Sequence, residues 1–378
     1  MPVHVVHLIA RLNDGGPARA IAALVAGLQA RHRLTVLTGT VGPGERDLSA
    51  LVAASGATVV ALPQLGRRLS LTGDWQALRA VRRELRRLRP DLLHTHTAKA
   101  GAIGRILARA MGIPCLHTYH GHVLHGYFPR WSSALAANAE RLLAGTAWHQ
   151  ALTLSQYHEL HEVARIGRRA RWRVLPLPIP VVTPCSAPWQ AQLRPAVPVL
   201  GFLGRLTAVK DGELWLRVLA LLQGRMAVQG VVCGDGEERA RLEQQARALG
   251  LPVLFTGFVP ASEALAVFGV LLMTSRNEGL PFAAIEAAGA GVPVVAPPVG
   301  GLVELIRWRA VRGARRTPEA LATACAALLT QPGLRRRQLA EGRRCALALA
   351  PEPIAARIEV LYAAMLATAG PQPVGAVA

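Results

Sequence analysis

Two glutamates with seven residues between them, Glu278 and Glu286, lie where a loop is expected to lead into a helix. Gly279 lets the backbone approach a ligand closely, and Pro281 suits the first turn of a helix. Residues 282–290 favour a helix, so Glu286 falls near its second turn and Glu278 precedes it. Amides at a helix start attract anions or hydroxyl groups. The pattern favours a polyhydroxylated, phosphate-bearing ligand such as a nucleotide sugar; the structural alternative is a helix start that simply favours acidic residues.

A second candidate site follows a predicted strand at residues 199–203. Arg205 and Lys210 lie on the loop after this strand. A guanidinium fork and an ammonium point charge at such spacing can hold a diphosphate between them. Lys210 is informative because only Lys99 and Lys210 among the 43 basic residues are lysines. The alternative is a solvated loop with no ligand.

All twelve histidines lie within the first 161 residues. The pairs His94/His96 and His120/His122 have a spacing that could chelate a metal. No acidic residue or cysteine pattern completes such a site, so we expect no metal. His120 follows a predicted strand at residues 114–118, and we expect it to act as a polar or proton-handling group beside a sugar. Most of the other histidines are expected to be structural.

The net charge of +20 and the pI near 11.4 raise the question of nucleic-acid binding. Aromatic residues make up only 4%, too few for a base-stacking surface, and no nucleic-acid module is readable. We therefore expect no nucleic-acid partner. The predicted helix at residues 75–89 carries a stripe of arginines, which is either a solvated face or a surface that docks on anionic phospholipid. These arginines are Arg79, Arg82, Arg83, Arg86, Arg87 and Arg89.

The five cysteines are scattered, which favours buried thiols in a reducing compartment over disulfides or a zinc site. The first residues lack the basic and apolar regions of a signal peptide, and no run of about 18 apolar residues is present. We therefore expect a cytoplasmic protein that at most contacts the inner face of the membrane.

Short apolar runs alternate with longer helical patterns along the whole chain, which is typical of parallel α/β sheets. The sequence predicts two doubly wound, Rossmann-like α/β domains facing a cleft. Residues 1–180 form the N-terminal, acceptor-binding domain, and residues 199–350 the C-terminal, nucleotide-sugar-binding domain. A proline-rich linker at 181–198 joins them. Residues 351–378 are expected to form a C-terminal helix, packing back on the N-terminal domain, and a disordered tail.

With these patterns in place, the chain resembles glycosyltransferase family 4, the retaining enzymes of the GT-B fold, over about residues 3–349. The resemblance depends most on residues 91–105 (DLLHTHTAKAGAIGR) and 117–128 (HTYHGHVLHGYF). Both segments are similar to bacterial surface-polysaccharide and lipid-linked glycan transferases. The resemblance implies a nucleoside-diphosphate sugar donor, UDP-linked by expectation, a glycan or lipid-linked acceptor, and no cofactor or metal.

The resemblance also implies roles for individual residues. Arg205 and Lys210 match the pair that holds the donor diphosphate. Glu278 matches the glutamate that contacts the donor sugar, and Glu286 the one that binds the ribose hydroxyls. The remaining matches are the backbone cradle Gly279, Leu280 and Pro281, the N-terminal glycine loop at Gly16, and the reaction-centre histidine at His120.

The sequence also departs from the family pattern. The run 175–180 replaces an Asn-Gly common near the connector, His149 replaces an aspartate, and residues 307–316 form an arginine-rich stretch in place of a glycine-punctuated hairpin. Three alternatives stay open at this point. They are a GT-B nucleotide-sugar epimerase, a decayed transferase acting as a binding or scaffold protein, and a metal hydrolase built on the histidines.

Overall fold

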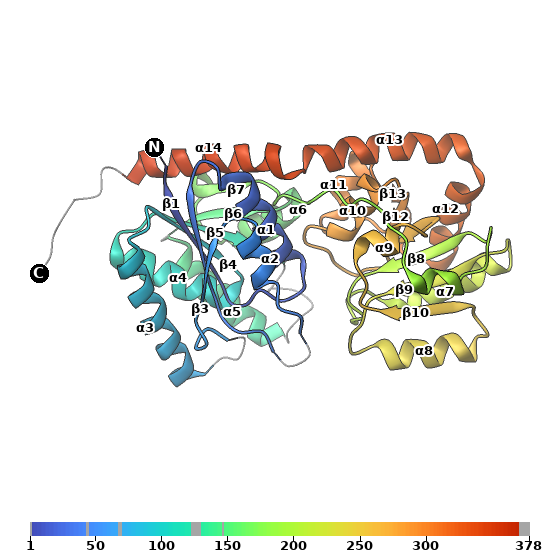
Figure 1. The fold of residues 1–378 in the computed structure, drawn as a ribbon, viewed down its shortest axis with the longest axis horizontal. Coiled ribbons are helices and arrows are strands. Elements are labelled where there is room, and N and C mark those ends of the chain that lie inside the picture. The colour runs from blue at the N-terminus through green and yellow to red at the C-terminus, as the bar shows by residue number, and fades with distance from the viewer. Residues whose placement is uncertain (1, 43–44, 67–69, 122–129, 146, 370–378) are drawn as a thin grey trace, which may run out of the picture. The chain divides into compact units, whose positions relative to one another are not determined.

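The computed structural model describes residues 2–42, 45–66, 70–121, 130–145 and 147–369. The chain divides into two compact units: Met1–Pro178 together with Leu349–Ala378 (unit 1), and Ile179–Ala348 (unit 2). Each unit contains one parallel sheet with helices packed against it (Figure 1). The alternation of apolar runs and helical patterns correctly predicted these two α/β sheets.

The sheet of unit 1 has seven parallel strands in the order β3-β2-β1-β4-β5-β6-β7. These strands are β1 (His4–Ile9), β2 (Arg33–Thr38), β3 (Thr58–Ala61), β4 (Leu92–His96), β5 (Cys115–Tyr119), β6 (Trp148–Ala151) and β7 (Trp172–Val174). The strand order reverses between β1 and β4, and ligands of open parallel sheets bind beyond the carboxyl ends of strands at such a reversal. The carboxyl end of β4 is His96.

The helices of unit 1 are α1 (Gly16–Leu28), α2 (Ser49–Ala54), α3 (Leu71–Leu88), α4 (Ala98–Met111), α5 (Arg130–Ala144), α6 (Leu154–Tyr157) and α14 (Pro351–Ala369). Helices α3 and α4 bury their apolar faces on the sheet. Leu85 of α3 and Leu107 of α4, for example, share one core with Leu8 of β1. Removing such apolar surface from water is the main force that holds helix and sheet together.

Helix α14 comes from the far end of the chain and packs on α1 of unit 1. Gly27 permits this contact, because a Cβ there would lie 2.6 Å from the Cβ of Ala355. His32 Nε2 lies 3.1 Å from Glu359 Oε1, and Tyr362 Oη lies 2.6 Å from His94 Nδ1. The C-terminal helix therefore completes the N-terminal unit. The predicted disordered tail, 370–378, lies outside the described residues.

The sheet of unit 2 has six parallel strands in the order β10-β9-β8-β11-β12-β13. The strands are β8 (Val199–Leu203), β9 (Gln229–Cys233), β10 (Val253–Gly257), β11 (Val270–Leu272), β12 (Val294–Ala296) and β13 (Arg312–Gly313). Its helices are α7 (Gly212–Gln223), α8 (Arg239–Ala248), α9 (Ala261–Leu265), α10 (Phe282–Gly289), α11 (Leu302–Arg307), α12 (Pro318–Thr330) and α13 (Pro332–Ala348). The strand order reverses between β8 and β11, so their carboxyl ends form the second candidate ligand position.

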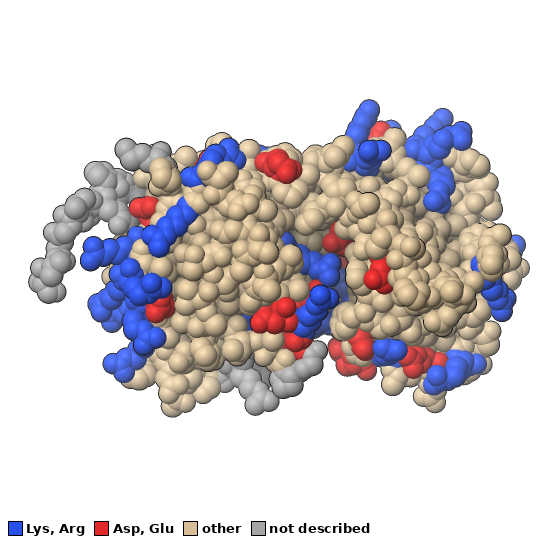
Figure 2. All heavy atoms as spheres, viewed as in Figure 1, with Lys and Arg blue, Asp and Glu red and all other residues tan. Residues whose placement is uncertain are grey.

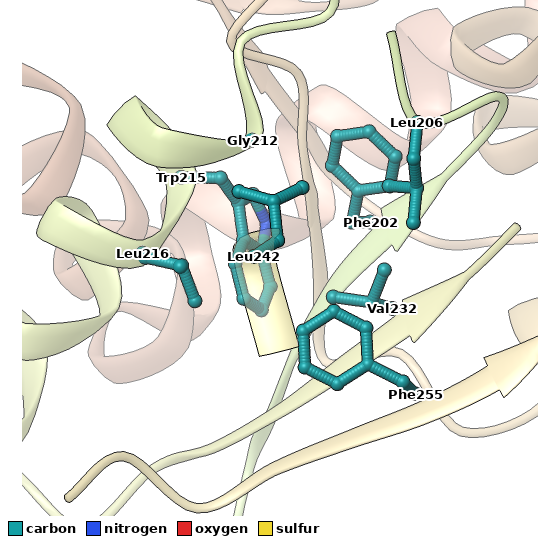
Figure 3. A pocket seen from close by; sticks show the side chains of 8 residues that line it. All are labelled: Phe202, Leu206, Gly212, Trp215, Leu216, Val232, Leu242 and Phe255. Carbon is teal, nitrogen blue, oxygen red and sulfur yellow. The ribbon is translucent and has the colours of Figure 1, made fainter. Parts of the chain in front are cut away.

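A small hollow lies between helices α7 and α8 and the sheet of unit 2 (Figure 3). It is lined by Phe202, Leu206, Gly212, Trp215, Leu216, Val232, Leu242 and Phe255. The indole nitrogen of Trp215 already donates to the carbonyl of Gly201 at 3.3 Å. Because this lining offers no charged or hydroxyl group, the hollow is a packing feature of the core and not a nucleotide site.

Two segments without a strong pattern in the sequence have defined contacts. Residues 181–198, the predicted proline-rich linker, are grouped with unit 2. There Trp189 Nε1 donates to Glu263 Oε2 at 2.9 Å, and Gln190 donates to the Glu263 carbonyl. A short 3-10 helix, Pro188–Gln192, forms there. Within the arginine-rich stretch 307–316, β13 pairs in parallel with β12 and closes the sheet edge. Among the described residues, no helix has the length and apolar character needed to cross a membrane.

Candidate functional site

In unit 2, the loops after β8 and β11 bring together two of the residues singled out from the sequence. Lys210 Nζ lies 2.5 Å from Glu278 Oε1, and the Ser275 hydroxyl donates to the same oxygen at 2.5 Å. The Glu278 side chain is only 8% exposed, whereas that of Lys210 is 26% exposed. A covered carboxylate is thus paired with a cation that remains open to solvent on one side.

The loop that carries Lys210 is fixed by the chain around it. Thr274 Oγ1 lies 2.9 Å from the carbonyl oxygens of both Lys210 and Asp211. Asp211 has a positive φ of 52° and caps α7 by accepting from the amide of Leu214. Its carboxylate also pairs with Arg276 at 3.3 Å. These bonds hold Lys210 in place before any ligand arrives.

The backbone around Glu278 depends on a glycine that the sequence reasoning did not single out. Gly300 has a φ of 49°, and a Cβ there would lie 1.9 Å from the Glu278 carbonyl oxygen. The same carbonyl accepts from the Gly301 amide at 2.9 Å. Only glycine fits such a close approach of two backbones. The signal in the sequence was the Gly300-Gly301 pair directly before α11.

The predicted cradle Gly279, Leu280 and Pro281 leads directly into α10, where Pro281 occupies the N-cap position. Glu286 lies in the second turn of α10, as its spacing predicted, and its side chain is buried. The two glutamates therefore lie on either side of the same helix start, one before it and one within it.

Arg205 follows Gly204, whose φ is 144°, at the carboxyl end of β8. A Cβ on Gly234 would lie 1.9 Å from the Gly204 carbonyl, so the loops after β8 and β9 are in backbone contact. This explains the glycines of the Cys233-Gly234-Asp235-Gly236 turn as structural. Arg205 itself is exposed, which leaves its guanidinium accessible to a ligand.

In unit 1, three histidine rings follow one another through hydrogen bonds. His120, directly after β5, has its Nε2 2.9 Å from Nδ1 of His96. His96 Nε2 lies 3.1 Å from Nδ1 of His7 in β1. Burial lowers the pKa of His7 to about 4, that of His120 to about 3, and that of His96 well below its usual value. All three rings are therefore neutral at pH 7.

His7, His94 and His96 bring their ring nitrogens within 4.8 Å of one another, the closest approach to a metal site in the described part of the chain. His94 uses both nitrogens in 2.6 Å hydrogen bonds, to Tyr362 and Thr118, while His7 and His96 bond each other. In this arrangement the rings of His94 and His96 use both their nitrogens in hydrogen bonds, and His7 uses one. Sequence reasoning missed His7, which joins the group because β1 and β4 pair His7 with His94.

The last predicted site residue, Gly16, is the first residue of α1, just beyond the carboxyl end of β1. Gly15 takes the N-cap position with an extended backbone. Gly16 and His120 thus lie in unit 1, while Arg205, Lys210 and the two glutamates lie in unit 2. His122 and His125 lie outside the described residues.

Two family models match this chain. Residues 15–178 match the glycosyl transferase 4-like domain, and residues 197–331 match the glycosyl transferases group 1. The chain is 32% identical over 280 residues to 2-deoxystreptamine glucosyltransferase of Streptomyces kanamyceticus, a match covering 65% of this chain and 70% of that protein.

Two further relatives widen the comparison. Over 317 residues, 80% of this chain and 81% of the other, it is 28% identical to GDP-mannose-dependent alpha-(1-6)-phosphatidylinositol dimannoside mannosyltransferase of Mycobacterium tuberculosis. It is 31% identical over 245 residues to 2-deoxystreptamine N-acetyl-D-glucosaminyltransferase of Streptomyces fradiae, where the match spans 58% of this chain and little more than half (57%) of the relative.

Among solved structures, Anabaena Alr3699/HepE in complex with UDP and glucose is similar over 96% of this chain and 100% of its own. The TM-score is 0.77 at 20% sequence identity. At that identity the likeness establishes the fold.

Proposed function

The chain belongs to the glycosyltransferases of the GT-B fold, and from that premise we propose that it transfers a sugar from a nucleoside-diphosphate sugar with retention of anomeric configuration. The observation that carries the proposal is the pair Lys210–Glu278 at the carboxyl ends of β8 and β11. A cation suited to holding a diphosphate and a carboxylate suited to accepting hydrogen bonds from sugar hydroxyls are adjacent there.

The diphosphate is proposed to lie between Lys210 and Arg205. A phosphate oxygen competes with Glu278 for the Lys210 ammonium, and the exposed Arg205 guanidinium adds two parallel donors. Donor binding would then release Glu278 from Lys210, leaving its carboxylate to accept from hydroxyls of the donor sugar. Ser275 keeps one Glu278 oxygen oriented during this exchange.

Glu286 is proposed to accept from the ribose hydroxyls, and the backbone of Gly279, Leu280 and Pro281 to approach the sugar. A UDP-linked donor is proposed first, since UDP is the nucleotide in the complex of the structurally similar Anabaena protein. The mycobacterial relative is named for GDP-mannose, so guanosine donors are the main competitor.

Retaining hydrolases use two carboxylates, one as nucleophile and one as acid and base, whereas the path proposed here uses no such pair. In our proposal the bond from the anomeric carbon to the diphosphate breaks while Arg205 and Lys210 stabilise the charge that develops on the diphosphate oxygen. The acceptor hydroxyl forms the new bond from the same face, and its proton passes to the departing diphosphate. His120 holds the donor sugar. Two cations suffice for the diphosphate, so no metal or other cofactor enters the proposal.

The proposed acceptor is a glycan or a lipid-linked glycan, and the proposed setting is synthesis of cell-surface polysaccharide in the cytoplasm. The relatives are named for 2-deoxystreptamine and for phosphatidylinositol dimannoside, two hydroxyl-rich acceptors. An epimerase would act on the same donor without an acceptor, and a decayed scaffold would bind neither productively.

A donor panel tests the proposal. Thermal unfolding is measured with UDP-, GDP-, ADP- and dTDP-linked sugars, and a ligand at 100 times its dissociation constant adds about 2.7 kcal/mol of stability. The best donor is then incubated with acceptor glycans. We expect stabilisation by one nucleotide class and an α-linked product from an α-linked donor, read by proton NMR. Stabilisation by no donor would contradict the proposal, and epimerised donor without transfer would favour the epimerase.

A second proposal, peripheral contact with anionic membrane, is supported by the outer face of α3. The inner face of this helix buries Ala77, Val81 and Leu85. Its outer face exposes Arg79, Arg82, Arg83, Arg86 and Arg87. Figure 2 shows basic side chains gathered where α3 lies in Figure 1.

Trp75, 57% exposed, stands on the same outer face with the Arg79 guanidinium 4.2 Å from its ring centre. Indole and arginine side chains together suit the headgroup region of a bilayer. Such docking would bring unit 1 to lipid-linked acceptors.

A further inference from the structure

The row His7–His96–His120 ends differently on its two sides. At the buried end, Nε2 of His7 has no hydrogen-bond partner in the part of the chain that the structure describes. At the other end His120 is partly exposed, and its Nε2 is already bonded to His96. Nδ1 of His120 is therefore the nitrogen left for a ligand.

Each ring in this row is neutral and carries one N–H and one lone pair. Since every link joins two such rings, all N–H groups in the row must point the same way. If they point toward His7, the buried Nε2 of His7 carries a proton with no acceptor. If they point toward His120, Nε2 of His7 carries only a lone pair, and His120 carries its proton on Nδ1.

The direction toward His120 is favoured, because a buried donor without an acceptor loses its hydrogen bonds to water and forms none in the protein. A neighbouring row on the same sheet shows how such a direction is fixed. Gln150 Nε2 donates to the Leu175 carbonyl at 2.7 Å, so its Oε1 accepts from Thr118. Thr118 must then accept from His94 Nε2, which leaves His94 Nδ1 to accept from Tyr362. That row ends on a backbone acceptor, whereas the row of His7 ends at a nitrogen with no partner among the described residues.

We propose that His96, oriented by His7, is a positioning residue that holds His120 in the tautomer with its proton on Nδ1. His120 then presents a fixed N–H donor to the ligand and cannot act there as a base. The identification of that ligand as the donor sugar rests on the proposed function, but the tautomer does not. A fixed donor suits a sugar hydroxyl or phosphate oxygen, each of which offers a lone pair.

The tautomer is measured without any substrate. Two-bond ¹H–¹⁵N correlations of protein labelled with ¹⁵N-histidine distinguish a proton on Nδ1 from one on Nε2, and His120→Gln assigns the signal. We expect His120 to show the Nδ1–H pattern from pH 6 to 8. An Nε2–H pattern, or stoichiometric zinc bound to the purified protein, would overturn the inference.

Two substitutions at His96 distinguish the effect of its hydrogen bond to His120 from the effect of its size. The amide of asparagine reaches the place of imidazole Nδ1, which bonds His120, whereas that of glutamine reaches the place of Nε2, which bonds His7. We expect His96→Gln to lower kcat about tenfold, the scale of one lost hydrogen bond, and His96→Asn to retain most activity. Binding of the nucleoside diphosphate should be unchanged in both.

The matched control is His117→Gln. His117 is a buried histidine of β5 that is bonded to Thr95 and not to His120. Equal turnover of the Asn and Gln variants, whether high or low, would overturn the positioning role. Full activity of His120→Ala would instead reject the role of His120 in the proposed function while leaving the NMR result intact.

Discussion

Acid should destabilise unit 1 selectively, because all twelve histidines lie in it and several are buried as neutral rings. Burial lowers the pKa of His7 and of His149 to about 4, and lowers the pKa values of His94, His96 and His117 well below 6.5. In the unfolded chain each ring titrates near 6.5. Between these pH values the unfolded chain takes up protons that the folded chain excludes, so stability falls as the pH falls.

At pH 5 each ring whose folded pKa is about 4 costs about 2 kcal/mol of stability relative to neutral pH. His7 and His149 together therefore cost about 4 kcal/mol, and the other buried rings act in the same direction. This is a large part of the stability of an ordinary domain, about 5–15 kcal/mol. We therefore expect unit 1 to be strongly destabilised at pH 5, while unit 2, which has no histidine, keeps its stability there.

Buried thiols report the two units separately. Cys115 lies buried in unit 1 and Cys325 buried in unit 2. Their labelling by a pyridyl disulfide across a urea series, at pH 7, 6 and 5, is read by mass spectrometry. The urea concentration at the midpoint of Cys115 labelling should fall steeply as the pH is lowered. The control His158→Gln, at an exposed position, should not change this midpoint. A Cys115 midpoint that stays constant from pH 7 to 5 would show that the buried histidines do not control the stability of unit 1.

Three further predictions concern the two glutamates, the metal requirement and the arginines of α3. Glu286→Gln should weaken the binding of free nucleotide and of nucleotide sugar alike, whereas Glu278→Gln should leave nucleotide binding unchanged and lower turnover. Calorimetry and kinetics measure these effects, and the reverse result would exchange the two roles. Turnover should survive excess chelator, and loss of activity that zinc restores would instead support a histidine metal site. Sedimentation with anionic liposomes should decrease with salt and in the variant Arg82→Glu/Arg83→Glu/Arg86→Glu. It should persist in the control Arg336→Glu/Arg337→Glu/Arg343→Glu, which has the same net charge on exposed positions of α13; equal binding to neutral vesicles would reject electrostatic docking.

The parallel sheets were predictable because their strands are buried on both faces and appear as continuous apolar runs. β8 spans the predicted residues 199–203. The short edge strands β7 and β13 were not expected, since two or three residues leave no periodic pattern. The prolines of residues 181–198 predicted a connector, but they could not predict the side-chain bonds from this segment to Glu263. Such contacts between distant residues have no signature in local composition.

The candidate site was likewise predictable only where its sequence signals are local. The spacing of Glu278 and Glu286 around a helix start was readable because loop and helix signals are local. The Lys210–Glu278 contact was not, because it joins two loops 68 residues apart. His7 was overlooked for a related reason: it meets His94 only through the pairing of β1 with β4. Gly300, whose missing side chain lets Glu278 lie where it does, becomes meaningful only when both backbones are seen.

The proposed function depends on the binding of the donor diphosphate by Arg205 and Lys210. Calorimetric titration of the free nucleoside diphosphate selected by the donor panel tests it directly, with Arg336→Ala as the control. Charged hydrogen bonds are worth about 1.5–3 kcal/mol, so Arg205→Ala and Lys210→Ala should each weaken binding about ten- to a hundredfold. Unchanged affinity in both variants would contradict this binding role.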